Sequence, residues 1–160
     1  MPLEFVRHAL GYLEAAEKLN SDITNGHWPG SYYRGQPVLW LAFHASELFL
    51  KAFILKLEPH ANANGHSLVD LLDQLKELLP NAQFNPLFVV EAMPPYPDLV
   101  EEAKKKNRVF HEVLRYPTDK RGDPWSGARG YSPGLFETGL ARLRTEAEAI
   151  YQELFEGADA

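Results

Sequence analysis

The chain has 160 residues, of which 45% are hydrophobic, and this length and composition predict one globular domain and argue against wholesale disorder. It contains no cysteine, which excludes disulfide bonds, thiolate nucleophiles and cysteine-bound zinc. A net charge of −6 disfavours a general attraction of nucleic acid to the whole surface, and the first residues lack the basic and apolar regions of a secretory signal. We therefore expect a cytoplasmic protein.

The first expected helix covers residues 2–20, where apolar side chains recur at three- and four-residue spacing. Residues 21–35 are expected to form a loop, because they contain the turn pairs Asn25-Gly26 and Pro29-Gly30. Several aromatic side chains lie in this loop. They either line a pocket or pin a long crossover onto the helices, and we favour the second interpretation.

The most apolar long segment covers residues 37–59, which begins and ends with proline and is expected to form a central, buried helix. Its few polar side chains fall on one narrow face when residues are placed at intervals of about 100°. We call this face the polar strip, and it consists of Trp40, His44, Glu47, Lys51 and Glu58. Because charged residues interrupt the segment, we expect it to pack inside the protein and not to cross a membrane.

The next helix is expected to begin after Ser67, which has the position of a capping residue, with Asp70 completing a capping box. This leucine-rich helix should end at Pro80. Prolines limit residues 81–97 to a short helical turn near residues 84–89. A fourth long helix is expected from residue 97 to Pro117, followed by a long loop to residue 134.

The last helix is expected to begin at Ser132 and Pro133, a capping residue followed by a proline at the first helical position. Its expected apolar stripe is Leu135, Leu140, Leu143, Ala147, Ile150, Tyr151 and Leu154. No segment predicts a strand. The sequence therefore predicts an all-α fold, a single domain over residues 1–160 that forms an antiparallel four-helix up-and-down bundle with an additional helix and two long loops.

Basic residues are concentrated between residues 104 and 144, where ten basic and four acidic side chains give a charge of +6 and leave −12 for the rest of the chain. Within this region, Lys104, Arg108, His111 and Arg115 share one face of the expected fourth helix. Arginine forks beside a histidine suit a phosphodiester ligand, because arginine holds phosphate and histidine moves a proton. The alternative is that Arg108 pairs with a carboxylate and that His111 packs in the interior.

A metal site would have to be built from His44, Glu47, His66 and His111. A di-metal site in a helical bundle needs several carboxylates that project inward, and the expected fourth helix pairs none of its own with the polar strip. We therefore expect no bound metal and no cofactor. Glu47 and Lys51 are instead expected to form an ion pair, because they lie four residues apart on one helix.

Three segments together resemble the HEPN family of helical domains. Residues 45–52 resemble the Glu-Leu-x-x-Lys-Ala sequence of the family's central helix, and residues 65–68 resemble its Gly-His-x-Leu turn. Residues 114–117 resemble the Arg-Tyr-Pro sequence that ends the family's fourth helix. The order and spacing of these segments cover most of the chain, from about residue 3 to residue 155.

The resemblance implies an all-α bundle similar to the substrate-side domain of kanamycin nucleotidyltransferase. It also implies homodimers and pairing with small nucleotidyltransferases in toxin–antitoxin systems. Many family members are metal-independent RNases with an Arg-x(4–6)-His motif, and this sequence departs from that motif. Lys106 replaces the arginine before His111, and Arg108 lies only three residues before it. Lysine cannot reproduce the two-pronged hydrogen bonding of arginine.

We therefore expect a non-catalytic HEPN-like module that binds a nucleotide, RNA or a partner protein in a groove between the central and fourth helices. The residues expected to line this groove are Glu47, Lys51, His66, Arg108, His111 and Arg115. One alternative is a metal-independent endoribonuclease in which His111 is the general base and Arg108 or Lys106 holds the phosphate. A second alternative is a dimerising scaffold without a ligand.

Overall fold

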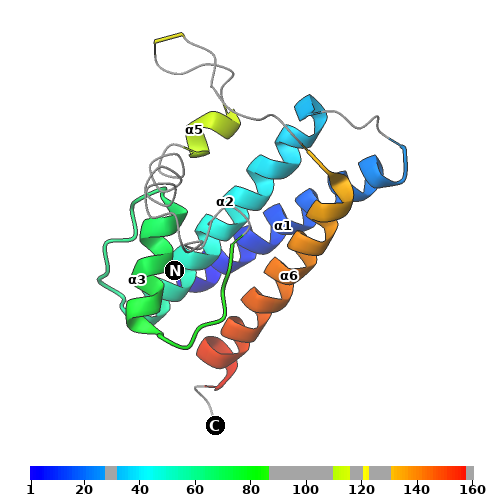
Figure 1. Ribbon diagram of the computed structural model, residues 1–160. Coiled ribbons are helices and arrows are strands. Elements are labelled where there is room, and N and C mark those ends of the chain that lie inside the picture. Colours follow the sequence, from blue (N-terminus) through cyan, green and yellow to red (C-terminus); the bar gives the residue numbers. More distant parts are fainter. Residues whose placement is uncertain (28–31, 87–109, 116–120, 123–130, 158–160) are drawn as a thin grey trace, which may run out of the picture.

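The computed structural model describes residues 1–27, 32–86, 110–115, 121–122 and 131–157 of the chain (Figure 1). Every regular element in these ranges is helical, which confirms the all-α prediction. The elements are α1 (Pro2–Thr24), α2 (Tyr32–Leu57), α3 (Leu68–Leu78), α5 (Phe110–Arg115), α6 (Pro133–Tyr151) and a π-helical turn, η1 (Gln152–Glu156). The antiparallel four-helix arrangement and the single domain stay predictions.

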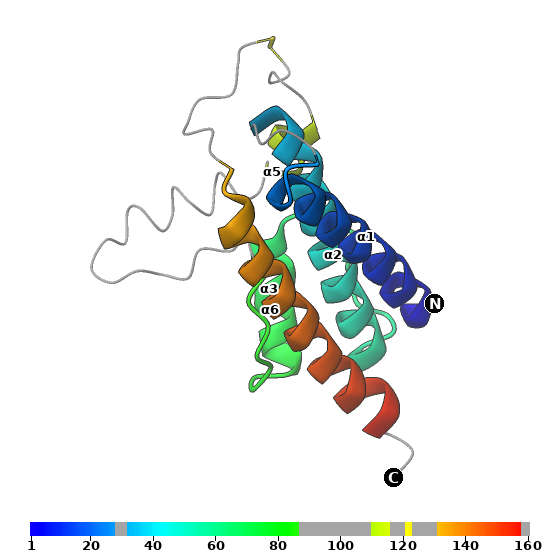
Figure 2. The same ribbon diagram turned by 90° about the vertical axis from the view of Figure 1, so that its right-hand side faces the viewer.

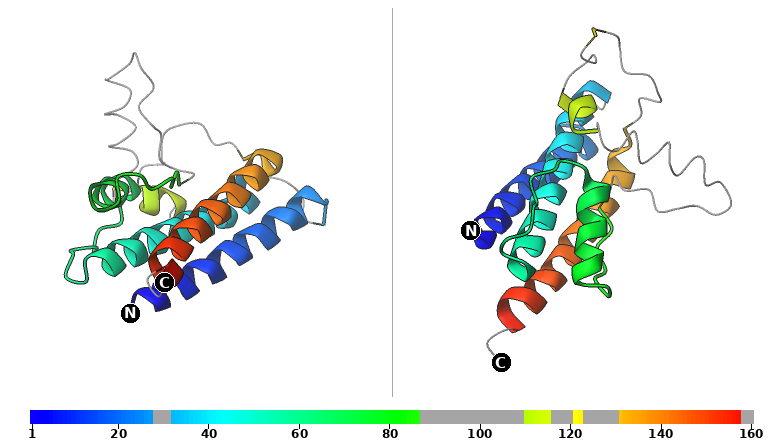
Figure 3. Two further views of the ribbon diagram at one scale, coloured as in Figure 1. Left: turned by 90° about the horizontal axis from the view of Figure 1, so that it is seen from below. Right: turned by 90° about the vertical axis from the view of Figure 1, so that its left-hand side faces the viewer.

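Helix α2 lies at the centre of the described structure, as expected, and contacts α1, α3, α5 and α6. Figures 1 and 2 show α1 and α2 side by side and running in opposite directions, and Figure 3 shows α6 beside both of them. The core around α2 is rich in aromatic rings: Phe49 stacks on Phe53 with centroids 6.0 Å apart, and Phe84 meets Phe53 edge-on at 5.8 Å. Because α2 is apolar on nearly every side, each neighbouring helix buries a different face of it.

By length and composition, Tyr33–Leu57 would be long and apolar enough to cross a membrane. The charged residues within this segment therefore do not by themselves exclude a membrane span. In the structure, 78% of the most apolar part of this helix is buried inside the protein, which is typical of a core helix.

Both ends of the expected first loop are helical, so this prediction was wrong at its boundaries. Helix α1 continues to Thr24 because Ile23 extends its buried face by one more turn. The turn at Asn25-Gly26 is present, with Gly26 in the left-handed region at φ 73°. Residues 28–31 of the expected loop lie outside the described residues.

Helix α2 also begins earlier than expected, at Tyr32, so Pro37 lies inside the helix and not at its start. Proline lacks an N–H group, so α2 lacks the hydrogen bond that residue 37 would otherwise donate to the carbonyl of Tyr33. Gly35 belongs to the same early part of α2. A Cβ atom at Gly35 would lie 2.2 Å from the ring of Tyr131, so the glycine lets this ring pack directly on the helix backbone.

Helix α3 has the expected boundaries. The side chain of Ser67 accepts a hydrogen bond from the backbone N–H of Asp70 at 3.3 Å, and the helix ends at Leu78, two residues before Pro80. Its buried residues are Leu68, Val69, Leu71, Leu72 and Leu75. Residues 84–86 of the expected short turn are not helical, and residues 87–89 lie outside the described part of the chain.

Helix α6 begins at Pro133 after Ser132, as expected, but the side chain of Ser132 makes no capping hydrogen bond. Asn20 of α1 holds this end instead: its amide donates to the carbonyl of Pro133 at 3.0 Å and accepts from the hydroxyl of Tyr131. The desolvation of that hydroxyl raises the pKa of Tyr131 to about 12.

The expected apolar stripe of α6 is wrong at Leu135, whose surface is 77% exposed. The buried residues of the helix are Leu140, Leu143, Ala147 and Ile150. Leu135 lies five residues before Leu140, and five residues do not return to the same side of a helix. Further along, Arg144 donates to both carboxylate oxygens of Glu17 at 2.9 and 2.7 Å and so joins α6 to α1.

Helix α5 is the described part of the expected fourth helix, and the expected end at Pro117 lies outside the described residues. The side chain of Gln36 in α2 donates to the carbonyl of Leu114 at 3.0 Å, which attaches α5 to the beginning of α2. Residues 97–109 of the expected helix, and most of the loop that follows it, lie outside the described residues.

Candidate functional site

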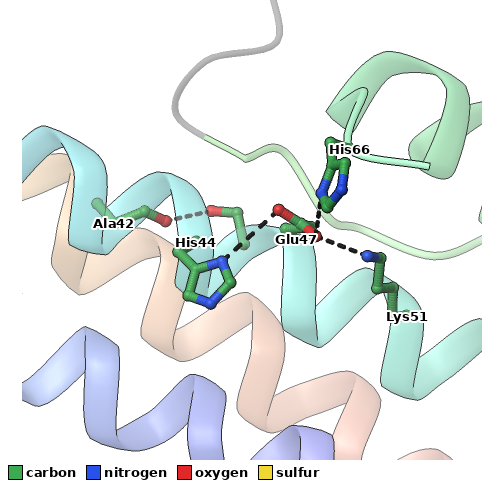
Figure 4. A network of polar contacts seen from close by, with 6 residues as sticks. Ala42, His44, Glu47, Lys51 and His66 are labelled. Atoms are coloured by element: carbon green, nitrogen blue, oxygen red, sulfur yellow. Dashed lines mark hydrogen bonds and ion pairs between the residues drawn. The ribbon is translucent and has the colours of Figure 1, made fainter. Parts of the chain in front are cut away.

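The carboxylate of Glu47 is the centre of the main polar cluster on α2. Glu47 is only 3% exposed, although it carries a charge on an otherwise apolar helix. Figure 4 shows His44, Lys51 and His66 converging on it, the first two from α2 and the third from the loop before α3. A buried carboxylate is stable only when charged and hydrogen-bonded partners replace the water it has lost.

Both carboxylate oxygens of Glu47 have partners. Lys51 Nζ donates to Oε1 at 2.6 Å, and His66 Nδ1 lies 3.0 Å from the same oxygen. His44 Nδ1 lies 3.6 Å from Oε2. The lysine is itself buried, so the predicted Glu47–Lys51 ion pair is confirmed and lies mostly out of contact with solvent.

The pKa of Glu47 reflects a competition between burial and these partners. Burial alone would raise it, because a charged carboxylate is disfavoured away from water. The contacts from His44, Lys51 and His66, together with the charge of Lys51, outweigh burial and lower the pKa to about 2. Glu47 is therefore an anion throughout the neutral range.

A row of aromatic rings continues the polar strip from His44 toward the start of α2. Trp40 stacks on His44, with centroids 5.3 Å apart and planes 18° apart. Tyr12 of α1 meets both rings edge-on, at 4.6 Å from His44 and 6.1 Å from Trp40. The guanidinium of Arg115 lies over the Trp40 ring at 6.0 Å from its centroid. Three helices therefore contribute to one surface.

We call this surface the α2–α5 face, and it consists of Tyr12, Trp40, His44, Glu47, Lys51, His66 and Arg115. The sequence predicted Glu47, Lys51 and His66 as neighbours, and the structure brings them into direct contact. It also brings Arg115 to the polar strip, through Trp40. The sequence analysis did not include Tyr12 among the expected site residues, and its place in the apolar repeat of the first helix gave no signal of a role at this face.

Other predicted site residues cannot be assigned to this face. Lys106 and Arg108 lie outside the described residues, and so does the side chain of His111. Glu58, the last member of the polar strip, is exposed and lies beyond the end of α2. Within the described ranges, no group of three or more His, Asp or Glu side chains is arranged to hold a metal ion.

The chain matches no family model, no curated protein and no solved structure. A HEPN-type domain therefore stays a prediction from the three short motifs. Two of these motifs meet in the structure, since Glu47 and Lys51 belong to the first and His66 to the second. Arg115 of the third motif lies at the other end of the same face.

Proposed function

We propose that the protein is a non-catalytic HEPN-like module that binds a nucleotide, RNA or a partner protein through the α2–α5 face. The observation that carries this proposal is the convergence of residues from all three motifs on one surface. The proposed domain is an antiparallel four-helix up-and-down bundle with an additional helix. The packing of α1, α3, α5 and α6 around α2 supports this arrangement.

The chemistry of the face suits a ligand with a planar ring and a negative charge. Trp40 and His44 offer ring surfaces, and aromatic side chains of this kind stack on bases without strict sequence preference. Arg115 supplies a cation beside these rings and hydrogen-bond donors suited to phosphate. The charges of Glu47 and Lys51 cancel within the cluster, so the guanidinium of Arg115 over the Trp40 ring is the cationic group closest to the aromatic part of the described face.

A binding assay with ATP, GTP and short single-stranded RNAs tests the proposal. A ligand at one hundred times its Kd stabilises the folded state by about 2.7 kcal/mol, which a melting curve detects easily. We expect Arg115→Ala to weaken binding. Arg7→Ala is the matched control, because Arg7 pairs with Glu4 on the exposed side of α1. The proposal is wrong for nucleotides and RNA if no probe changes the melting temperature.

The alternative function, a metal-independent endoribonuclease with His111 as base and Arg108 or Lys106 as phosphate ligand, has a separate test. RNA is incubated with the protein in EDTA, and wild type is compared with His111→Ala. Cleavage that disappears in the variant would overturn the non-catalytic proposal. The departure from the Arg-x(4–6)-His motif at Lys106 and Arg108 is the reason to expect no cleavage.

For the partner, we propose a homodimer that works in the cytoplasm, away from membranes, with a nucleotidyltransferase-type protein in a toxin–antitoxin system. This part rests on the family resemblance. Sedimentation at micromolar concentration tests the homodimer, and a monomer would contradict it and the scaffold alternative as well. A nucleotidyltransferase gene beside the gene for this chain would favour the toxin–antitoxin role.

A further inference from the structure

The Glu47–His66 contact determines which nitrogen of His66 carries the proton. Oε1 of Glu47 already accepts a hydrogen bond from the Lys51 ammonium at 2.6 Å. A buried ammonium needs a counter-charge, so this carboxylate is ionised and offers only lone pairs to its other neighbours. His66 Nδ1 lies 3.0 Å from the same oxygen. A lone pair on Nδ1 would face a lone pair on Oε1, whereas a proton on Nδ1 makes a charge-assisted hydrogen bond.

We infer that Glu47 is a positioning residue that holds neutral His66 in the Nδ1–H form, so that Nε2 accepts a hydrogen bond and the site meets its ligand through an O–H or N–H group. The statement about the ligand rests on the proposed binding function, whereas the statement about the proton does not. Whatever group lies against Nε2 of neutral His66, it has to be a donor.

The position of His66 makes this relevant to binding. One edge of the ring touches the buried carboxylate, while the side chain as a whole is 57% exposed (Figure 4). The ring therefore links the interior of the cluster to the surface. A carboxylate that fixes the orientation and proton position of a histidine is a common device at functional sites, because the second ring nitrogen is then presented in one defined state.

His44 is an internal comparison, because it faces the same carboxylate at a longer distance. Its Nδ1 lies 3.6 Å from Oε2, beyond a normal hydrogen bond. The preference for the Nδ1–H form should therefore be weaker at His44 than at His66. His8 and His60 are exposed and serve as references for histidines without such a partner.

The test is a long-range proton–nitrogen correlation spectrum of protein labelled with ¹⁵N-histidine. It is recorded at about pH 8.5, where an ordinary imidazole with a pKa of about 6.5 is neutral. We expect His66 to favour the Nδ1–H form by about tenfold or more, the effect of one charge-assisted hydrogen bond. His8 and His60 should show the distribution of free histidine. A spectrum in which neutral His66 carries its proton mainly on Nε2 would overturn the inference.

A double variant, Glu47→Leu with Lys51→Met, removes the carboxylate without leaving a buried lysine unpaired. We expect the His66 signal to move to the distribution of His60, and an unchanged Nδ1–H signal would show that Glu47 does not position the ring. If the variant does not fold, the wild-type spectrum still decides the question.

The ligand part is tested with ATP and a short oligouridine as probes. His66→Asn keeps an N–H group near the place of Nδ1 but removes the acceptor at Nε2, so binding should weaken several-fold while the melting temperature is unchanged. Unchanged binding would refute this part. If neither probe binds the wild type, the proposed function for these ligands fails, and the spectrum alone decides whether Glu47 positions His66.

Discussion

Replacing Glu47 with glutamine tests whether the central carboxylate stabilises the fold. The substitution keeps the shape of the side chain but leaves the Lys51 ammonium, whose side chain is only 10% exposed, without its counter-charge. Breaking one partner of a buried ion pair costs about 3–5 kcal/mol. The lowering of the Glu47 pKa from 4.5 to about 2 gives a similar figure, about 3.5 kcal/mol at roughly 1.4 kcal/mol for each pH unit.

The measurement is urea unfolding followed by circular dichroism, with the midpoint and slope fitted for each variant. A loss of this size is a large part of the 5–15 kcal/mol that stabilises a typical domain, and it should lower Tm by about 10 °C. Glu4→Gln is the matched control, because Glu4 pairs with Arg7 on α1 but its side chain is 59% exposed. We expect the control to cost less than about 1 kcal/mol. Equal losses in the two variants would refute the reasoning.

The double variant Glu47→Leu with Lys51→Met separates a missing contact from an unpaired charge. If the buried ammonium causes the loss in Glu47→Gln, removing both charges should restore most of the stability, because well-packed apolar residues often replace a buried pair at little cost. A double variant as unstable as Glu47→Gln would show that the contacts of the carboxylate with His44 and His66 matter more than the charge of Lys51.

Three further predictions concern pH, glycine and histidine. The folded-state pKa of Glu47 lies below its ordinary value, so the stabilisation that its charge provides is complete above about pH 4.5 and is lost as the pH falls toward 2. The difference in urea midpoint between wild type and Glu47→Gln should therefore shrink over that range. A difference that stays constant would contradict this. Gly35→Ala should destabilise the protein, because the new Cβ would collide with the Tyr131 ring. Gly11→Ala should stabilise the protein by about 0.5–1 kcal/mol, because Gly11 lies in open space within α1. Thermal melting that gives both changes the same sign would refute the packing argument. His66→Gln should lower the melting temperature more than His66→Asn, because only asparagine places an amide near the position of Nδ1, and the reverse order would argue against the contact with Glu47.

The parts of the fold that the sequence predicted correctly depend on residues close together in the chain. Ser67 and Pro80 mark the beginning and end of α3 because capping and the missing proline N–H act within one turn. The Glu47–Lys51 pair could be predicted for the same reason, because side chains four residues apart are neighbours on any helix. The start of α2 was predicted wrongly because Pro37 was taken as its first residue, whereas the helix begins at Tyr32 and contains the proline.

The candidate site likewise contains residues that the sequence predicted and residues that only the packing of helices brought together. The polar strip follows from the helical repeat alone, and it predicted Trp40, His44, Glu47 and Lys51 on one side of α2. The repeat could not predict that Tyr12 would meet Trp40 and His44, because that contact depends on how α1 is rotated against α2. Arg115 reached the strip through the packing of α5 on the first part of α2.

The sequence by itself determined that the chain is helical, that its most apolar helix lies around residues 37–59, and that this helix carries one narrow polar face. Only the tertiary structure decided that His66, nineteen residues from Glu47, completes the partners of that carboxylate. It also decided that Tyr131 packs on Gly35 and that Arg144 binds Glu17. The physical reason is one of range: helical periodicity and capping act over one or two turns, whereas contacts between helices depend on how complete apolar faces pack together.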